Sequence, residues 1–207
     1  MEPIKYVIFD MGQVLLKFTP ERILTPWFGE FGESVMQDMH RLIFESGDWA
    51  KTDTGLYEDR EILDGWIAKV PVCFHAPLRN MMEGWYRGME PVDGMETLIC
   101  ELKAKGYKTY LLSNTSLRFL DYWQDFEVLR LLDGHFISAT CHLTKPDPEI
   151  FKAALSQFDL SAEHTFFVDD LSKNIEGAAA VGMRGFCFKN YDVDGLRQAL
   201  RREGVRV

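Results

Sequence analysis

From about residue 91 onward the chain alternates helix-like and strand-like patterns, and this alternation restricts its fold more than any other feature. Apolar residues recur at i, i+3, i+4 and i+7 from Met95, and Gly106 ends the predicted helix. Predicted strands then lie at 109–112, 136–138, 165–168 and 185–188, and predicted helices at 149–158, 173–181 and 193–202. With a strand at 4–9, this order predicts an α/β protein whose parallel sheet carries helices on both faces.

Between the first strand and residue 91 the sequence changes character. Segments 35–44 and 78–86 are rich in Met and aromatic residues at helical spacing, with Gly, Pro and Asp between them. We therefore expect a helical domain over 17–90, inserted into an α/β core domain made of 1–16 and 91–207. Acidic residues outnumber basic ones in the insertion, so it has no basic face for a polyanion, and its aromatic residues are expected to form a small core of their own.

Composition excludes several classes of partner. Hydrophobic residues make up 46% of the 207, enough for a buried core, and the net charge of −9 disfavours binding to nucleic acid or to anionic membranes. The apolar run at 6–9 is too short for a signal peptide or a membrane span, so we expect a cytoplasmic protein. The four scattered cysteines suggest buried, reduced thiols.

Polar residues follow the predicted strands at the positions where an open α/β sheet binds ligands. Asp10 follows the first strand, 113–115 (Ser-Asn-Thr) follow the second, and Asp169 and Asp170 follow the strand at 165–168. Lys145 precedes a predicted helix. Each Asp or Ser alone is as well explained by a helix cap or a turn, and a lone lysine by a solvated surface position, but together these residues are expected to meet at one edge of the sheet.

Three carboxylates at one edge repel each other unless a cation lies between them or their pKa values shift. Oxygen ligands without nearby Cys or His favour Mg²⁺, which keeps positions open for water and phosphate. Lys145 would supply a further positive charge. Pro146 favours an extended backbone at Lys145, and Asp147 and Pro148 suit the N-cap and first turn of the next helix, so the lysine is expected to point at the site.

Four segments in this order resemble the motifs of the haloacid dehalogenase-like hydrolase superfamily. They are FDMGQVLL at 9–16, LLSNTS at 111–116, KPDPEIF at 145–151 and FFVDDLSKNIEGA at 166–178. Within the superfamily the chain is most similar to sugar-phosphate phosphatases and to the phosphatase domain attached to some epoxide hydrolases. The resemblance implies a Rossmann-like core, with the helical insertion in the place of a cap after the first strand.

The resemblance also implies roles for the acidic residues. Asp10 would be the nucleophile that forms an aspartyl-phosphate, and Mg²⁺ would be bound by Asp10, the backbone carbonyl of Gly12 and Asp170. Asp169 would lie beside the metal or share it through a water. Asn174 falls where the family commonly has another polar or acidic residue, and would orient this group.

The remaining site residues would hold the phosphoryl group. Ser113 offers a hydroxyl, the turn at Asn114 offers N–H donors, and Lys145 neutralises the phosphoryl oxygens while the nucleophile attacks in line. The implied partner is a small phosphorylated metabolite, such as a sugar phosphate, without nucleic acid or membrane. The substrate's identity and the oligomeric state are left open.

One departure from the family pattern keeps alternatives open. Most of its phosphatases carry a second Asp two residues after the nucleophile as general acid and base, whereas this chain has Gly12. General acid–base help is worth about 100- to 10,000-fold, so we expect a preference for good leaving groups. A non-catalytic phosphate-binding protein is the main alternative. A dehalogenase and a phosphorylation-receiver domain fit less well, because the Asp169–Asp170 pair is foreign to the former and misplaced for the latter.

Overall fold

A five-stranded parallel sheet forms the centre of the computed structural model, which describes residues 2–207. The strand order is β5-β4-β1-β6-β7. The strands are β1 (Tyr6–Phe9), β4 (Lys108–Ser113), β5 (Gly134–Ile137), β6 (Thr165–Asp169) and β7 (Arg184–Cys187). The predicted α/β parallel sheet is confirmed, and β1 lies at its middle between β4 and β6.

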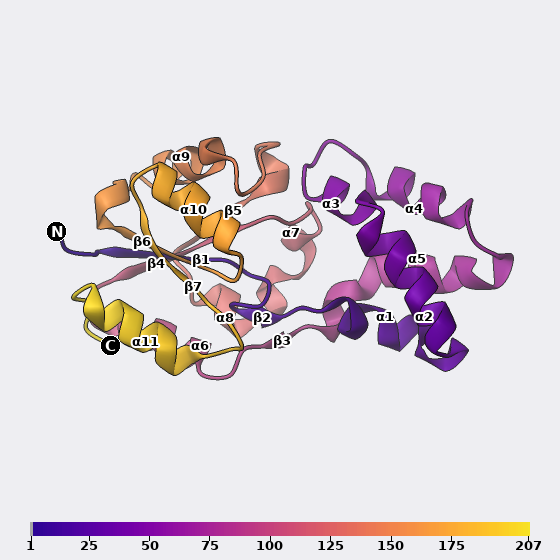
Figure 1. The fold of residues 1–207 in the computed structure, drawn as a ribbon, viewed down its shortest axis with the longest axis horizontal. Coiled ribbons are helices and arrows are strands. Elements are labelled where there is room, and N and C mark those ends of the chain that lie inside the picture. Colours follow the sequence, from indigo (N-terminus) through magenta and orange to yellow (C-terminus); the bar gives the residue numbers. More distant parts are fainter. Residues whose placement is uncertain (1) are drawn as a thin grey trace.

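Helices cover both faces of the sheet (Figure 1). On one face lie α9 (Pro148–Gln157) and α10 (Ser172–Ala180), and on the other α6 (Met95–Ala104) and α11 (Val193–Arg202). Side chains of β1 alternate between the two resulting cores: Val7 and Phe9 pack on the α6 and α11 side, and Ile8 packs on the α9 and α10 side. All three are fully buried, which explains the continuous apolar run.

The segment between β1 and α6 is helical, and it lies beyond the ends of the sheet strands (Figure 1). A two-stranded antiparallel sheet of β2 (Leu16–Lys17) and β3 (Glu90–Pro91) joins the outgoing and returning chain at its base. Its helices are α1 (Pro20–Phe28), α2 (Glu33–His40), α3 (Asp48–Thr52), α4 (Asp59–Ile67) and α5 (His75–Gly84), with the short turns η1 (Gly29–Phe31), η2 (Arg41–Glu45), η3 (Val72–Phe74) and η4 (Trp85–Gly88). We refer to residues 20–88 as the helical insertion. The division into two domains remains a prediction.

Short helical turns that the sequence patterns do not predict complete the α/β part. They are α7 (Phe119–Tyr122), η5 (Trp123–Asp125), α8 (Glu127–Arg130), η6 (Ser138–Thr140) and η7 (Ala162–His164). Single turns contain too few residues to show an apolar period, so tertiary contacts decide them. Tyr122 and Phe119, for example, are buried in the same core as β1.

Two smaller expectations need correction. Asp169 and Ser113 are the last residues of β6 and β4 rather than the first residues after these strands, because their backbones still pair with β7 and β5. The cysteines are free thiols but not buried: Cys73 and Cys100 are exposed, and Cys141 and Cys187 are half-buried. Within residues 2–207, no helix has the length and apolarity to cross a bilayer.

Candidate active site

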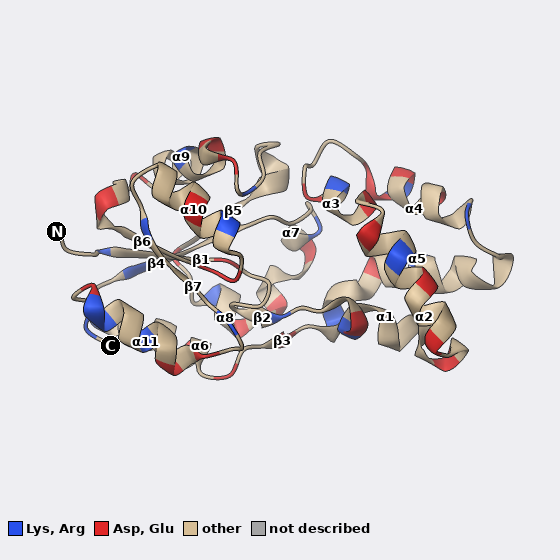
Figure 2. Ribbon diagram, in the orientation of Figure 1, with Lys and Arg blue, Asp and Glu red and all other residues tan. Residues whose placement is uncertain are grey.

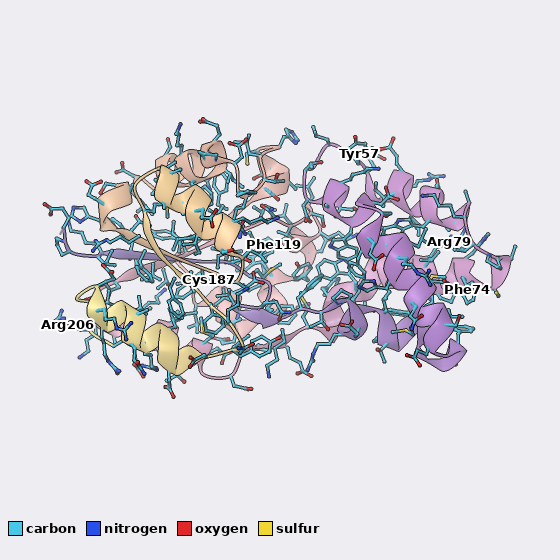
Figure 3. The ribbon with its side chains drawn as sticks, viewed as in Figure 1. Tyr57, Phe74, Arg79, Phe119, Cys187 and Arg206 are labelled. Carbon is cyan, nitrogen blue, oxygen red and sulfur yellow. The ribbon has the colours of Figure 1, made fainter. Side chains whose placement is uncertain are left out.

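The carboxyl ends of the sheet strands face the helical insertion, and side chains fill the space between the two parts (Figures 1 and 3). A cavity of about 300 Å³ lies there. Both parts contribute to its walls, and the lining includes the predicted site residues Asp10, Gly12, Ser113, Asn114, Lys145, Asp170 and Asn174. Residues predicted from distant strands therefore come together at one edge of the sheet.

Asp10 is held at the end of β1 by the sheet itself. Its backbone N–H donates to the carbonyl of Val168 on β6 at 2.8 Å, so the chain continues in strand geometry up to the carboxylate. The residue is buried, with one carboxylate oxygen 2.7 Å from Lys145 Nζ. Burial raises the pKa of Asp10 to about 7, Lys145 opposes this rise and the carboxylate of Asp169 adds to it.

Lys145 is fixed from several directions although it follows no strand. Its backbone N–H donates to Asn114 Oδ1 at 2.8 Å, and Asn114 Nδ2 donates back to its carbonyl at 3.0 Å. The ammonium donates to the carbonyl of Leu112 at 3.0 Å and to Asp169 at 2.7 Å. Burial would lower the pKa of Lys145, but Asp10 and Asp169 together raise it above the ordinary lysine value, so the side chain is charged.

The loop that carries Lys145 is packed closely against α10. Gly177 of α10 faces the carbonyl of Pro146, and a Cβ at this position would overlap that oxygen. The predicted helix start after the loop is also present: the side chain of Asp147 accepts from the N–H of Glu149 at 2.9 Å, and Pro148 begins the helix. Local sequence and close packing thus aim the lysine at Asp10.

Asp169 is completely buried and its carboxylate is already hydrogen-bonded. Asn174 Nδ2 donates to both of its oxygens, at 2.9 and 3.0 Å, and the N–H of Leu171 donates at 2.8 Å. Together with the Lys145 contact, these bonds engage both carboxylate oxygens of Asp169 and fix its orientation.

Asp10, Asp169 and Asp170 each place one carboxylate oxygen within 4.8 Å of the others. Asp170 is half-buried, and burial together with the Asp169 charge raises its pKa. Among residues 2–207 no side-chain hydrogen bond to the Asp170 carboxylate is present, so its oxygens face the cavity unengaged. The three carboxylates carry more negative charge than the one buried lysine can neutralise, and all of the available donor atoms are oxygens. Both features suit a hard divalent cation such as Mg²⁺.

The groups expected to hold phosphate surround the same point. Ser113 ends β4 and is buried beside the cavity. The side chain of Asn114 is engaged with the backbone of Lys145, so any phosphate contact of this residue would come from its backbone N–H. Gly12 lies at the cavity, and a Cβ there would meet Phe18 Cβ at 3.8 Å, which is ordinary contact.

The helical insertion, together with Phe18 just before it, supplies an apolar wall. Phe18, Trp49 and Trp85 line the cavity and contact each other, with ring centroids 5.1 to 6.1 Å apart. Met82 of α5 completes this wall. The aromatic residues of the insertion therefore do more than form a core for it, because Trp49 and Trp85 also line the cavity.

Three polar residues that line the cavity have no signal in the sequence patterns. Asp53 and Asp59 enter the cavity from the insertion, and Arg118 from the turn before α7. Arg118 forms an ion pair with Asp59 that joins the two parts of the molecule. Ser138 follows β5 and donates to the carbonyl of Asp53 at 2.6 Å; its place at the end of the predicted strand 136–138 is the one available clue to a role beside the site.

Charged residues elsewhere follow no comparable pattern. Figure 2 shows acidic and basic residues interspersed along the helices of both parts. Several exposed pairs connect residues one turn apart, as for Arg41 with Asp38 and Lys152 with Glu149. Such pairs contribute at most about 1 kcal/mol each, so they do not mark a second site.

Comparison of the sequence with known proteins points to hydrolases. The family model described as haloacid dehalogenase-like hydrolase matches residues 4–182. The sesquiterpene phosphatase astK of Aspergillus oryzae is 32% identical over 189 residues, which cover 87% of this chain and 88% of that protein. Flavin mononucleotide hydrolase 1 of Arabidopsis thaliana is 21% identical over 201 residues, 97% of this chain and 78% of that protein.

The fold also matches a solved structure. A HAD family enzyme of Bacteroides thetaiotaomicron, in complex with magnesium and inorganic phosphate, superposes with a TM-score of 0.71 at 24% identity. The match covers 90% of this chain and 94% of that one. At this identity the likeness concerns the fold, which both chains share over nearly their whole length.

Proposed function

Since the chain belongs to the haloacid dehalogenase-like hydrolase family, we propose that it is a magnesium-dependent phosphatase acting on a small phosphate monoester. The observation that carries the proposal is the Asp10–Lys145 pair at the end of β1, inside a cavity also lined by Ser113 and Asp170. A phosphatase name on a relative with 32% identity and the phosphate complex of the structural neighbour support it.

In this proposal Asp10 attacks phosphorus and forms an aspartyl-phosphate, which water then hydrolyses. Lys145 holds the Asp10 carboxylate in place and neutralises phosphoryl oxygens, and the Ser113 hydroxyl donates to one of them. Asp10, Asp170 and the carbonyl of Gly12 would hold Mg²⁺, with Asp169 orienting the group. The metal, when bound, supplies positive charge to the transferring phosphoryl group.

The wall of the insertion bears on the substrate class. Phe18, Trp49 and Trp85 offer apolar surface to the part of the substrate beyond the phosphate. Arg118, the one arginine that lines the cavity among the described residues, is paired with Asp59. This lining favours a monophosphate whose organic part has an apolar face, which includes aryl and prenyl phosphates and the apolar face of a sugar ring, over a nucleotide with further phosphates.

Phosphate release from aryl, prenyl and sugar monophosphates, with Mg²⁺ and with a chelator, tests the proposal. We expect release that requires Mg²⁺ and falls to background in Asp10→Asn, because an amide cannot form the acyl-phosphate. Binding of phosphate and Mg²⁺ without release from any ester would instead favour the non-catalytic binding protein. Halide release from haloacids without metal would favour a dehalogenase.

A further inference from the structure

The site lacks a proton donor at the position where the family pattern has one. Gly12 has no side chain, yet an alkoxide leaving group needs a proton as its bond to phosphorus breaks. Lys145 is committed to Asp10 and Asp169, and Ser113 has no titratable group in the useful range. Any general acid must therefore come from another part of the cavity wall.

Two carboxylates from the helical insertion line the cavity, and they differ in their partners. Asp59 forms an ion pair with Arg118, so its carboxylate is already engaged. Asp53 has no ion pair within residues 2–207. The hydrogen bond found there for its carboxylate is a long one from Thr52 Oγ1, at 3.5 Å. Of these two carboxyl groups, Asp53 is thus the one that is free to exchange a proton with a ligand.

The backbone of Asp53 is fixed to the α/β part, so its carboxyl group is part of the site and not of a loose loop. Its carbonyl accepts from Ser138 Oγ at 2.6 Å, and Ser138 Oγ in turn accepts from the N–H of Thr115 at 2.9 Å. Thr115 follows Asn114, the residue that holds Lys145. One short chain of hydrogen bonds therefore connects Asp53 to the phosphate-binding turn.

The two residues after Asp53 are docked as closely. The ring Nδ1 of His142 lies 2.9 Å from the carbonyl of Thr54. Gly55 has a φ of +65°, and a Cβ at this position would overlap the carbonyl of Ala139. The backbones of the insertion and the α/β part thus touch beside Asp53, which fixes the backbone of Asp53 at the wall of the cavity that Asp10 also lines.

The surroundings of Asp53 suit a group that gains and loses a proton near neutral pH. Burial raises the pKa of Asp53 to about 7; the Thr52 hydroxyl lowers it, Asp10 raises it and Lys145 lowers it. Burial is the main cause that raises the pKa of the Tyr122 phenol, and the charge of Asp53 raises it further. The phenol therefore stays protonated. The charges of Asp10 and Lys145 act on Asp53 across the cavity.

We propose that Asp53 of the helical insertion is the general acid and base of the phosphatase reaction, in the place of the side chain absent at position 12. The inference rests on the proposed function. As the Asp10 oxygen bonds to phosphorus, the bond to the ester oxygen breaks and that oxygen takes the proton of the Asp53 carboxylic acid, which releases the alcohol.

In the second step Asp53, now a carboxylate, takes a proton from water as the water oxygen bonds to phosphorus. The bond between phosphorus and Asp10 breaks, its electron pair returns to the Asp10 carboxylate, and inorganic phosphate leaves. Asp53 ends the cycle protonated, so protons and electron pairs balance over the two steps.

The dependence of kcat/KM on the leaving group tests this role, because kcat/KM includes the first chemical step and not the second. In Asp53→Asn we expect kcat/KM to fall about 100-fold or more for an alkyl phosphate and by less than about threefold for 4-nitrophenyl phosphate, whose leaving group needs no proton. The matched control is Asp64→Asn, which removes an exposed carboxylate from α4 of the same insertion. It should leave both values unchanged.

A second variant guards against a purely structural effect. Gly12 has room for a Cβ, so an Asp can be placed there. In the double variant Gly12→Asp with Asp53→Asn, kcat/KM for the alkyl phosphate should be at least about tenfold higher than in Asp53→Asn alone. An equal loss for both leaving groups in Asp53→Asn, or no loss for either, would overturn the role of Asp53. If the wild-type protein releases no phosphate from any ester, the proposed function itself fails, and this outcome is seen before any variant is made.

Discussion

The ammonium of Lys145 lies 2.7 Å from the carboxylate of Asp10, and this buried ion pair brings a loop residue to the end of the central strand. A second carboxylate, Asp169, is equally close to the same nitrogen. Lys145 is therefore the cation on which two buried carboxylates depend, and this arrangement affects both stability and catalysis.

Removal of Lys145 should destabilise the protein as well as inactivate it. Lys145→Met keeps most of the volume but leaves Asp10 and Asp169 buried without their cation, so we expect a loss of about 3 to 5 kcal/mol in the free energy of unfolding. Urea denaturation without Mg²⁺ measures this loss of unfolding free energy. The exposed Lys152, paired with Glu149, provides the control Lys152→Met, for which the loss should stay below about 1 kcal/mol. Equal losses for the two variants would contradict the prediction.

Asp170 should govern metal affinity more than folding. In Asp170→Ala we expect the Mg²⁺ concentration for half-maximal activity to rise at least about tenfold, because a cavity-facing oxygen ligand is lost. The thermal unfolding temperature without metal should change little, since no side-chain hydrogen bond to this carboxylate is broken within the described residues. Asp194→Ala, at an exposed position of α11, is the control. An unchanged Mg²⁺ requirement would remove Asp170 from the metal site.

The ion pair between Arg118 and Asp59 should hold the helical insertion over the cavity. Both side chains are about one quarter exposed, so we expect Arg118→Ala to cost about 1 kcal/mol and to raise KM about fivefold. Arg130→Ala breaks an ion pair confined to α8 and should leave KM unchanged. A double-mutant cycle with Asp59→Ala checks the mechanism: fully additive effects on KM would show that the pair does not act as a unit.

Asp53 should make stability depend on pH in a definite direction. Its pKa is about 7 in the folded protein and near 3.8 when unfolded, so the folded state binds more protons between these values, and stability falls as pH rises through this range. At 1.36 kcal/mol per pKa unit the cost reaches about 4 kcal/mol above pH 7, as an upper bound for a partly accessible side chain. Asp53→Asn removes this cost.

We therefore expect Asp53→Asn to raise the thermal unfolding temperature by several degrees at pH 8 and by much less at pH 5, measured without Mg²⁺. Asp64→Asn should show no such pH difference, because its carboxylate is exposed. A stabilisation that is the same at both pH values would mean that the Asp53 carboxyl group does not carry a raised pKa.

Much of the sheet could be predicted because its signals are local. Strands β1, β4 and β6 show continuous or alternating apolar runs, and helices α6 and α11 show the helical period. Each of these patterns can be read within a single element, because it only marks which side chains of that element are buried. The turn before α9 is also local, since Asp147 caps the helix that Pro148 begins. The same is true of the polar residues at strand ends, whose meeting at one edge follows from parallel topology alone.

The sequence by itself thus determined the α/β sheet, the location of a helical segment after the first strand, and the group of Asp10, Lys145 and the Asp169–Asp170 pair at the sheet edge. Only the tertiary structure decided that Asp53 and the aromatic wall of the insertion face this group. The physical reason is that their position depends on how the insertion docks, through the contacts of Ser138 with Asp53 and of Arg118 with Asp59. Contacts between segments far apart in the chain leave no periodic trace in either segment, so no local pattern could reveal them.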